Sequence, residues 1–309
     1  MPCTHEKVGT HKPEWLKIKL HNDPRYAAVA ALVRRHDLHT ICSSGRCPNI
    51  STCWSRGTAT FMIGGDVCTR ACRFCATKSS ASPAPLDPAE PQRIARSVQL
   101  MELRHAVITS VDRDDLPDGG AAHWAETVRA IRALNPNTTI ELLIPDFSGD
   151  TGLLDVVLDA GADIVGHNLE TTARLTPTVR DRRASYDTSL QVLRHIAARG
   201  AALGRDDLAK SALMVGLGET CDEVLGALDD LAAAGVRRMT IGQYLQPTSR
   251  HYPVAEYVHP DLFARYAAAA VERGIVHTES GPLVRSSYMA DRLAPKMSRP
   301  LNTLTAQKG

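Results

Sequence analysis

The chain has 309 residues, of which 43% are hydrophobic and 23% charged, so it can bury a sizeable core as one α/β barrel or as two smaller domains. Its formal net charge of +2 is too close to zero to favour nucleic acid or an anionic membrane surface as a partner. The sequence has no apolar run of about 18 residues and no secretory signal core, which predicts a cytoplasmic protein without a membrane span.

Residues 1–57 are expected to form an N-terminal extension, because the first β-rich run begins only at residue 58. Six of the eight cysteines lie within residues 42–75, in two groups of three. Such clustering favours metal ligation over a disulfide framework, which would leave most of these cysteines without a distant partner.

Six runs dominated by apolar or β-branched residues follow, as is typical of buried parallel strands. They span residues 58–64, 105–111, 138–146, 162–170, 211–219 and 237–246.

Between these runs lie segments whose apolar residues recur at helical spacing. The predicted helices span residues 88–103, 122–134, 185–200 and 221–236, and one more is expected at 260–274.

This alternation of strands and helices predicts an α/β fold, a partial (β/α)6 barrel similar to a TIM barrel, over residues 58–260. An open doubly wound sheet is the alternative. Residues 261–309 are expected to supply a C-terminal helix and an irregular polar tail that carries the sequence Arg-Ser-Ser-Tyr at 285–288.

The downstream cysteines Cys68, Cys72 and Cys75 have the spacing C-x3-C-x2-C, directly after the first strand. Iron–sulfur clusters are held by cysteine thiolates, so three of them leave one iron of a [4Fe-4S] cluster open to a reactant. Zinc is the less favoured alternative, because it requires a fourth ligand that the local sequence lacks. The motif, with Phe74 before its last cysteine, resembles that of the radical S-adenosylmethionine (SAM) superfamily, which implies a SAM-binding cluster and a barrel of the radical SAM type.

The upstream cysteines Cys42, Cys47 and Cys53 have the spacing C-x4-C-x5-C. A second group of three thiols, also without a nearby fourth ligand, favours a second cluster over a zinc site.

Together with further motifs, these cysteines resemble the lipoyl synthase family from about residue 40 to residue 290. The further motifs are ELLIPDF (141–147), GHNLET (166–171), VGLGET (215–220), GQYLQPT (242–248) and GPLVRSSY (281–288).

The resemblance implies that the upstream cysteines hold an auxiliary [4Fe-4S] cluster whose fourth ligand is a serine of the C-terminal motif. We assign Ser287, although the sequence alone does not separate it from Ser286. The implied reaction consumes the auxiliary cluster and inserts two sulfur atoms, at the sixth and eighth carbons of a protein-bound octanoyl chain. Each C–H bond is broken by a separate 5′-deoxyadenosyl radical, so two SAM molecules are used.

Asn168 and Glu170 resemble the position at which such enzymes hold the ribose of SAM. A carboxylate that accepts hydrogen bonds from both ribose hydroxyls is a common arrangement. A solvated acid at the start of a helix remains the alternative for Glu170.

The resemblance also implies the partners of the reaction. The octanoyl group is expected on a lipoyl carrier domain, either of the acyltransferase subunits of 2-oxoacid dehydrogenases or of the glycine cleavage H protein. Flavodoxin or ferredoxin is expected as electron donor, and the chain is expected to act as a monomer.

Two other functions remain open at this point. Another radical SAM enzyme with an auxiliary cluster, such as a methylthiotransferase, usually carries extra domains for which this chain has no room. An electron carrier or cluster scaffold would close its clusters with four cysteines each, which neither group of three provides.

Overall fold

Seven parallel strands form one curved sheet in the computed structural model, which describes residues 12–17, 23–35, 40–44, 47, 49–288 and 290. The strands lie side by side in the order in which they follow in the chain. They are β1 (Thr58–Ile63), β4 (His105–Ser110), β5 (Thr139–Leu143), β6 (Ile164–Gly166), β7 (Ala209–Val215), β8 (Arg238–Gln243) and β9 (His277–Gly281). The short strands β2 (Val67–Cys68) and β3 (Lys78–Ser79) pair with each other in a separate parallel ribbon.

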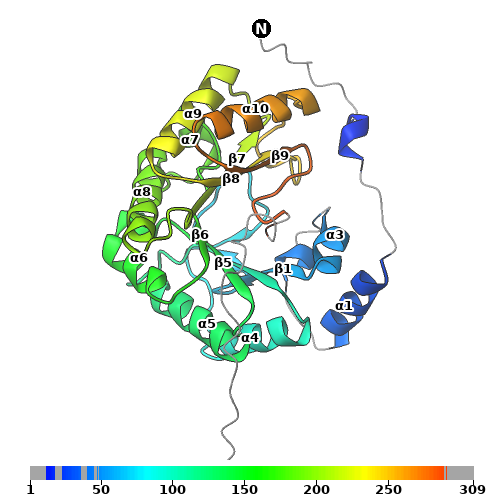
Figure 1. Ribbon diagram of the computed structural model, residues 1–309, viewed down its shortest axis with the longest axis vertical. Coiled ribbons are helices and arrows are strands. Elements are labelled where there is room, and N and C mark those ends of the chain that lie inside the picture. Colours follow the sequence, from blue (N-terminus) through cyan, green and yellow to red (C-terminus); the bar gives the residue numbers. More distant parts are fainter. Residues whose placement is uncertain are drawn as a thin grey trace, which may run out of the picture.

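Helices surround the outside of this curved sheet, as Figure 1 shows. A doubly wound sheet would reverse its strand order at a switch point, whereas this order never reverses. The predicted partial (β/α) barrel is therefore confirmed. The connecting helices are α4 (Glu90–Leu100), α5 (Ala121–Leu134), α6 (Thr151–Leu158), α7 (Thr176–Val179), α8 (Tyr186–Ala202), α9 (Cys221–Ala233) and α10 (Pro260–Glu272).

All six predicted strands are present, but β6 is much shorter than the run at 162–170. The chain leaves the sheet after Gly166, and only an isolated bridge joins Glu170 to Leu213. Glu170 has a φ of 69°, a left-handed conformation that no regular strand contains. Asn168 and Glu170 therefore lie in the loop after β6 and not within the strand.

Several elements were not predicted, among them β9 and α6. The strand β9 has the sequence HTESG, whose polar residues give no apolar run, yet it pairs with β8 from Arg238–His277 to Gly242–Gly281. The expectation of an irregular tail is wrong here. The helix α6 was also missed, and the side chain of Asp150 caps its start by accepting the backbone N–H groups of Gly152 and Leu153.

The core lies between the sheet and the outer helices, because the strands are buried on both faces. All six residues of β8 are buried, as are five of the six in β1. Side chains such as Ile108, Val128 and Leu154 join neighbouring strands and helices in one apolar cluster.

Three helices precede the barrel at the open edge of the sheet, two of them against β1 and the first against the third (Figure 1). They are α1 (Pro24–Arg35), α2 (Ile41–Ser44) and α3 (Ile50–Ser55), preceded by the 3-10 turn η1 (Glu14–Leu16). Trp54 of α3 is buried, with its ring 5.8 Å from that of Tyr26. The two helices α2 and α3 thereby fix Cys42 and Cys53 next to the first strand.

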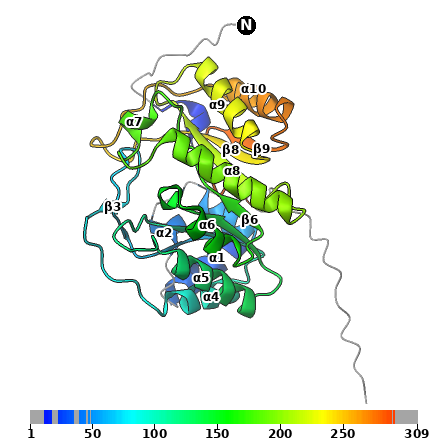
Figure 2. The same ribbon diagram turned by 90° about the vertical axis from the view of Figure 1, so that its left-hand side faces the viewer.

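The loops after the strands gather at one end of the barrel. Figure 2 shows β3 and α7 on the same side of the molecule, although about 100 residues separate them. A backbone hydrogen bond of 2.9 Å from Arg73 N–H to the carbonyl of Val179 joins these two regions. In the part of the chain that the structure describes, no helix is both long and apolar enough to cross a membrane.

Candidate functional site

A cavity of about 920 Å³ opens at the carboxyl ends of the strands, the end at which α/β barrels carry their active sites. The three downstream cysteines line it, and so do Cys42 and Cys47 of the upstream group. The predicted contacts Phe74, Asn168 and Glu170 line the same cavity. The structure therefore brings both groups of cysteines to one space.

The downstream sulfurs receive backbone hydrogen bonds from distant parts of the chain. The Sγ atom of Cys68 accepts hydrogen bonds from the backbone N–H groups of Arg70 at 3.4 Å and Asp112 at 3.3 Å. The Sγ atom of Cys72 accepts the N–H of Asp181 at 3.2 Å. Donors directed at sulfur stabilise the thiolate form that binds iron.

Without a cation these thiols stay protonated at neutral pH. Burial, with a smaller contribution from the nearby carboxylate of Asp112, raises the pKa of Cys68 to about 11. Burial likewise raises the pKa of Cys72 to about 12. A metal centre removes the proton from a coordinating thiol, so the site is suited to a cationic group.

The cysteine loop is held in place by a loop that follows β8. His251 contacts the carbonyl of Cys75 through Nε2 at 3.0 Å, and its Nδ1 contacts the hydroxyl of Thr248 at 2.8 Å. The N–H of Tyr252 donates to the carbonyl of Arg73 at 2.8 Å. The guanidinium of Arg73 in turn lies 5.0 Å from the centre of the Tyr252 ring. The barrel thus fixes the spacing of the three thiols.

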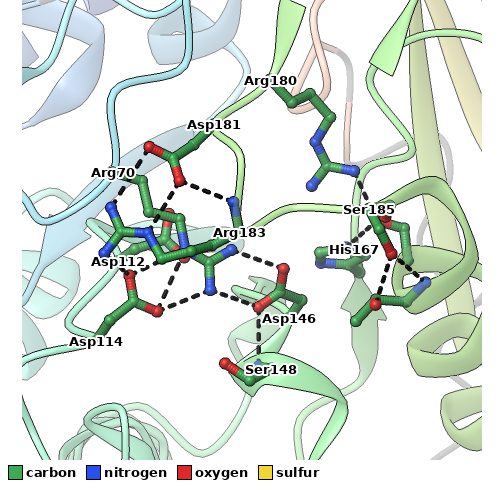
Figure 3. Close-up of polar contacts among 12 residues, drawn as sticks. Arg70, Asp112, Asp114, Asp146, Ser148, His167, Arg180, Asp181, Arg183 and Ser185 are labelled. Atoms are coloured by element: carbon green, nitrogen blue, oxygen red, sulfur yellow. Dashed lines mark hydrogen bonds and ion pairs between the residues drawn. The ribbon is translucent and has the colours of Figure 1, made fainter. Parts of the chain in front are cut away.

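A cluster of charges supports the same loop from inside the barrel. Arg70 is 4% exposed and donates bidentately to Asp146, at 2.6 and 2.7 Å, and to Asp114. Figure 3 shows Arg70 and Arg183 among the carboxylates of this cluster. Burial alone would raise the pKa of Asp146, but the hydrogen bonds from Arg70 hold it below its usual value. Asp146 follows β5, so the charge pair ties the cysteine loop to the sheet.

The upstream cysteines Cys42, Cys47 and Cys53 line a second, smaller cavity together with Ser287 and Arg285. Ser286 does not line this cavity, although both serines line the larger one. None of the six cysteines in the two groups is joined in a disulfide. The structure thus places the segment that carries Ser287 against the upstream group.

Direct contacts fix this arrangement. The side-chain amide of Asn49 donates to the carbonyl of Leu283 at 2.7 Å, which joins the segment before α3 to the C-terminal segment. Arg285 donates to the carbonyl of Gln243, the last residue of β8, at 3.0 Å. A Cβ atom at Gly242 would lie 2.1 Å from the carbonyl oxygen of Val284, so only glycine allows the approach.

In the described part of the chain, no three histidine, cysteine or acidic side chains are grouped as the ligands of one metal ion would be. In a cubic iron–sulfur cluster each thiolate binds a different iron, so the ligands surround the cluster instead of converging on a point. Two groups of three thiols at the cavities fit such clusters better than they fit a single ion.

Asn168 and Glu170 lie close together beside the larger cavity. The amide of Asn168 donates to a carboxylate oxygen of Glu170 at 3.0 Å. Burial raises the pKa of Glu170, which Arg180 and Asn168 oppose. Phe74 packs against an apolar group that includes Val179 and Tyr244. All three predicted contacts therefore line the larger cavity.

Sequence reasoning missed Arg180, which also lines the cavity. Its side chain is 8% exposed, and one Nη atom donates to the hydroxyl of Ser189 at 2.7 Å. Its Nε has no hydrogen-bond partner among the described residues. Figure 3 shows Arg180 apart from the Arg70 cluster. Nothing in the local sequence VRDRR separates this arginine from its exposed neighbours, because burial depends on the tertiary fold.

Comparison with protein families gives a match to the radical SAM superfamily over residues 62–242. A lipoyl synthase of Bacteroides thetaiotaomicron is 58% identical over 281 residues, which cover 91% of this chain and 97% of the relative. A lipoyl synthase of Flavobacterium johnsoniae is 52% identical over 94% of this chain and 99% of the relative.

Two solved structures have a similar fold. Methylornithine synthase (PylB) gives a TM-score of 0.53 at 12% identity and covers 81% of this chain and 73% of its own. HydG, a maturase of the [FeFe]-hydrogenase, gives a TM-score of 0.54 at 13% identity and covers 82% of this chain and 62% of its own. At these identities the likeness concerns the fold alone.

Proposed function

The chain belongs to the lipoyl synthase family of radical SAM enzymes, and on that premise we propose which of its residues hold the two clusters, SAM and the substrate. Cys68, Cys72 and Cys75 hold the [4Fe-4S] cluster that binds SAM. The upstream cysteines hold the auxiliary cluster, with Ser287 as its fourth ligand. When bound, the first cluster supplies an electron to cleave SAM, and the second supplies sulfur.

The position of Ser287 is the observation that carries this assignment. Ser287 lines the same small cavity as all three upstream cysteines, whereas Ser286 does not. A hydroxyl is a harder ligand than a thiolate, so it is the weakest of the four donors. Ser287 therefore provides the position at which the auxiliary cluster opens, and Arg285 anchors the serine segment to β8.

Three groups on the wall of the larger cavity are suited to SAM. Glu170, held by Asn168, accepts hydrogen bonds from the ribose hydroxyls. Arg180 brings its guanidinium to the lining of the cavity and binds the carboxylate of SAM. Phe74, next to Cys75 in the cysteine loop, packs against Val179 and Tyr244 and so holds this loop against the barrel.

The substrate we propose is an octanoyl chain on a lysine of a lipoyl carrier domain, from a 2-oxoacid dehydrogenase acyltransferase subunit or the glycine cleavage H protein. Sulfur enters at its sixth and eighth carbons. The cavity shared by both groups of cysteines is the space in which this chain lies between SAM and the sulfur source. Flavodoxin or ferredoxin as electron donor, a monomeric state and a cytoplasmic location complete the proposal.

A methylthiotransferase is not favoured. Relatives named lipoyl synthase are 52–58% identical over at least 91% of this chain.

The assignment of the two groups is tested by Cys68→Ala and Cys42→Ala, purified and reconstituted without oxygen. The Cys68 variant should lose SAM cleavage and lipoyl formation together. The Cys42 variant should still form 5′-deoxyadenosine from SAM but no lipoyl group on an octanoylated carrier peptide. Lipoyl formation by the Cys42 variant would falsify the assignment of the sulfur donor.

A further inference from the structure

The larger cavity extends below the cysteines to a buried ion pair inside the barrel. Glu141 of β5 and Lys210 of β7 both line it, and the ammonium of Lys210 donates to the carboxylate of Glu141. Both residues are almost completely buried, at 2% and 3% exposure. Nothing in the proposed roles of the clusters or of SAM accounts for this pair.

The register of the sheet gives the depth of the pair. Thr60 pairs with Val107 and Val107 with Glu141, and all three line the cavity. His105 precedes Val107 by two residues and so lies farther from the carboxyl ends of the strands. It contacts Glu141 through Nε2 at 3.1 Å but does not line the cavity. Among the described residues, the cavity therefore ends at Glu141 and Lys210.

The walls above this floor are suited to a hydrocarbon chain. Met62 and Leu143 line the cavity two residues closer to the strand ends than Glu141, and Val107 lines it at the level of Glu141. Such side chains favour a chain of methylene groups over a polar ligand.

We propose that Glu141 and Lys210 form the floor of an acyl channel and set the length of the acyl chain that the enzyme accepts. The proposal rests on the proposed function, which supplies the octanoyl group as occupant. The methyl end of the chain points toward the ion pair, and the carrier stays at the rim.

An ion pair makes a firm floor for a physical reason. A longer chain could enter only by separating the two charges or displacing them into an apolar core, which costs more than burying extra methylene groups returns. His105 supports Glu141 from below. Burial alone would raise the pKa of Glu141, but Lys210 and His105 hold it below its usual value, so this carboxylate stays ionised.

The test compares two double variants that remove both charges and keep an acceptor for His105. Glu141→Gln with Lys210→Ala deepens the channel by the volume of the lysine side chain. Glu141→Gln with Lys210→Met keeps that volume filled and is the matched control. Binding of hexanoylated, octanoylated and decanoylated lysine peptides to the cluster-loaded enzyme with SAM is measured by titration calorimetry, and product formation by mass spectrometry.

Wild type should bind the octanoyl peptide at least about 10-fold more tightly than the decanoyl peptide, the scale of discrimination that pockets achieve for small changes in an alkyl group. The deepened variant should lose this preference, and the methionine control should keep it. Val107→Phe, which makes the channel shallower, should shift the preference toward hexanoyl and provides an independent test if the deepened variant does not fold.

The possible results test the floor of the acyl channel and the proposed function separately. If wild type binds all chain lengths equally, Glu141 and Lys210 do not form the floor of the channel. The same holds if the deepened variant folds and still prefers the octanoyl peptide. Selective octanoyl binding by wild type without any lipoyl product contradicts the proposed function and leaves the floor supported.

Discussion

Ser287 and Ser286 are neighbours in the chain, yet the structure gives them different surroundings. Only Ser287 lines the small cavity with Cys42, Cys47 and Cys53. The sequence could predict that one serine of the pair serves as a ligand, through the family resemblance. It could not predict which one, because side-chain direction in this turn depends on how Val284 and Arg285 pack on β8.

Replacing Ser287 with alanine should remove the fourth ligand of the auxiliary cluster. We expect lipoyl formation to fall by about 100-fold or more, since even residues that only support a metal ligand cost 10- to 100-fold when replaced. Cleavage of SAM should persist. Mössbauer spectra and iron content measure the change, with Ser286→Ala as the control. Loss of the auxiliary cluster in the Ser286 variant instead would show that the assignment is reversed.

Arg180 gives a second prediction for a single residue. Because Arg180 lines the larger cavity and is proposed to bind the carboxylate of SAM, Arg180→Gln should weaken SAM binding by about 10- to 100-fold, as expected for loss of a hydrogen bond between charged groups. The exposed neighbour Arg182 provides the control, and Arg182→Gln should bind SAM as wild type does. Dissociation constants from calorimetry check this, and equal affinity in both variants would contradict the proposed role of Arg180.

At the scale of secondary structure, apolar strands were easier to predict than polar or short elements. The buried strands β1, β4, β7 and β8 give long apolar runs because helices cover them on one side and the interior on the other. β9 lies at the edge of the sheet and is only half-buried, so its polar residues carry no such pattern. The helix α6 was missed because its 8 residues are too few to give a clear helical period, although Asp150 is recognisable in the sequence as a capping residue.

The contact between β8 and the serine segment predicts an effect of a single methyl group. Gly242→Ala places a Cβ atom 2.1 Å from the carbonyl of Val284, so the segment must move. We expect a loss of about 1–3 kcal/mol in the free energy of unfolding and a lower iron content of the auxiliary cluster.

The matched control is Gly226→Ala. Gly226 lies within α9 and its added Cβ would meet nothing within 4 Å, so this variant should be as stable as wild type or more stable by about 0.5–1 kcal/mol. Denaturation midpoints and iron analysis compare the two. Equal iron content in both variants would argue against a coupling of β8 to the serine segment.

The link between β5 and the cysteine loop gives a prediction about stability. Asp146→Asn removes the main partner of buried Arg70 and should cost about 3 kcal/mol at neutral pH. The pKa of Asp146 is lowered in the folded state, so its contribution is complete above the usual value of 3.8 and is lost as the pH falls below it. The stability difference between wild type and variant, from urea unfolding, should therefore shrink in acid. A difference that does not change with pH would contradict this.

At the scale of the whole molecule, the barrel could be predicted from the sequence. The contact between the segment before β1 and the segment after β9 could not. Strand periodicity is local, and it gave the parallel sheet. The contact of Asn49 with Leu283 joins segments that are 234 residues apart, and no local pattern indicates it. The family resemblance supplied that expectation. The division into residues 1–57, 58–260 and 261–309 stays a prediction, with β9 of the last segment paired to β8 of the barrel.

The central claim is that the sulfur comes from a cluster held by Cys42, Cys47, Cys53 and Ser287. The enzyme is reconstituted with iron and ³⁴S-sulfide, transferred to buffer with ³²S-sulfide, and allowed one turnover on an octanoylated carrier peptide. We predict that mass spectrometry of the product will find two ³⁴S atoms in each lipoyl group and no more than one lipoyl group per chain. A product that carries ³²S from the buffer would contradict the claim.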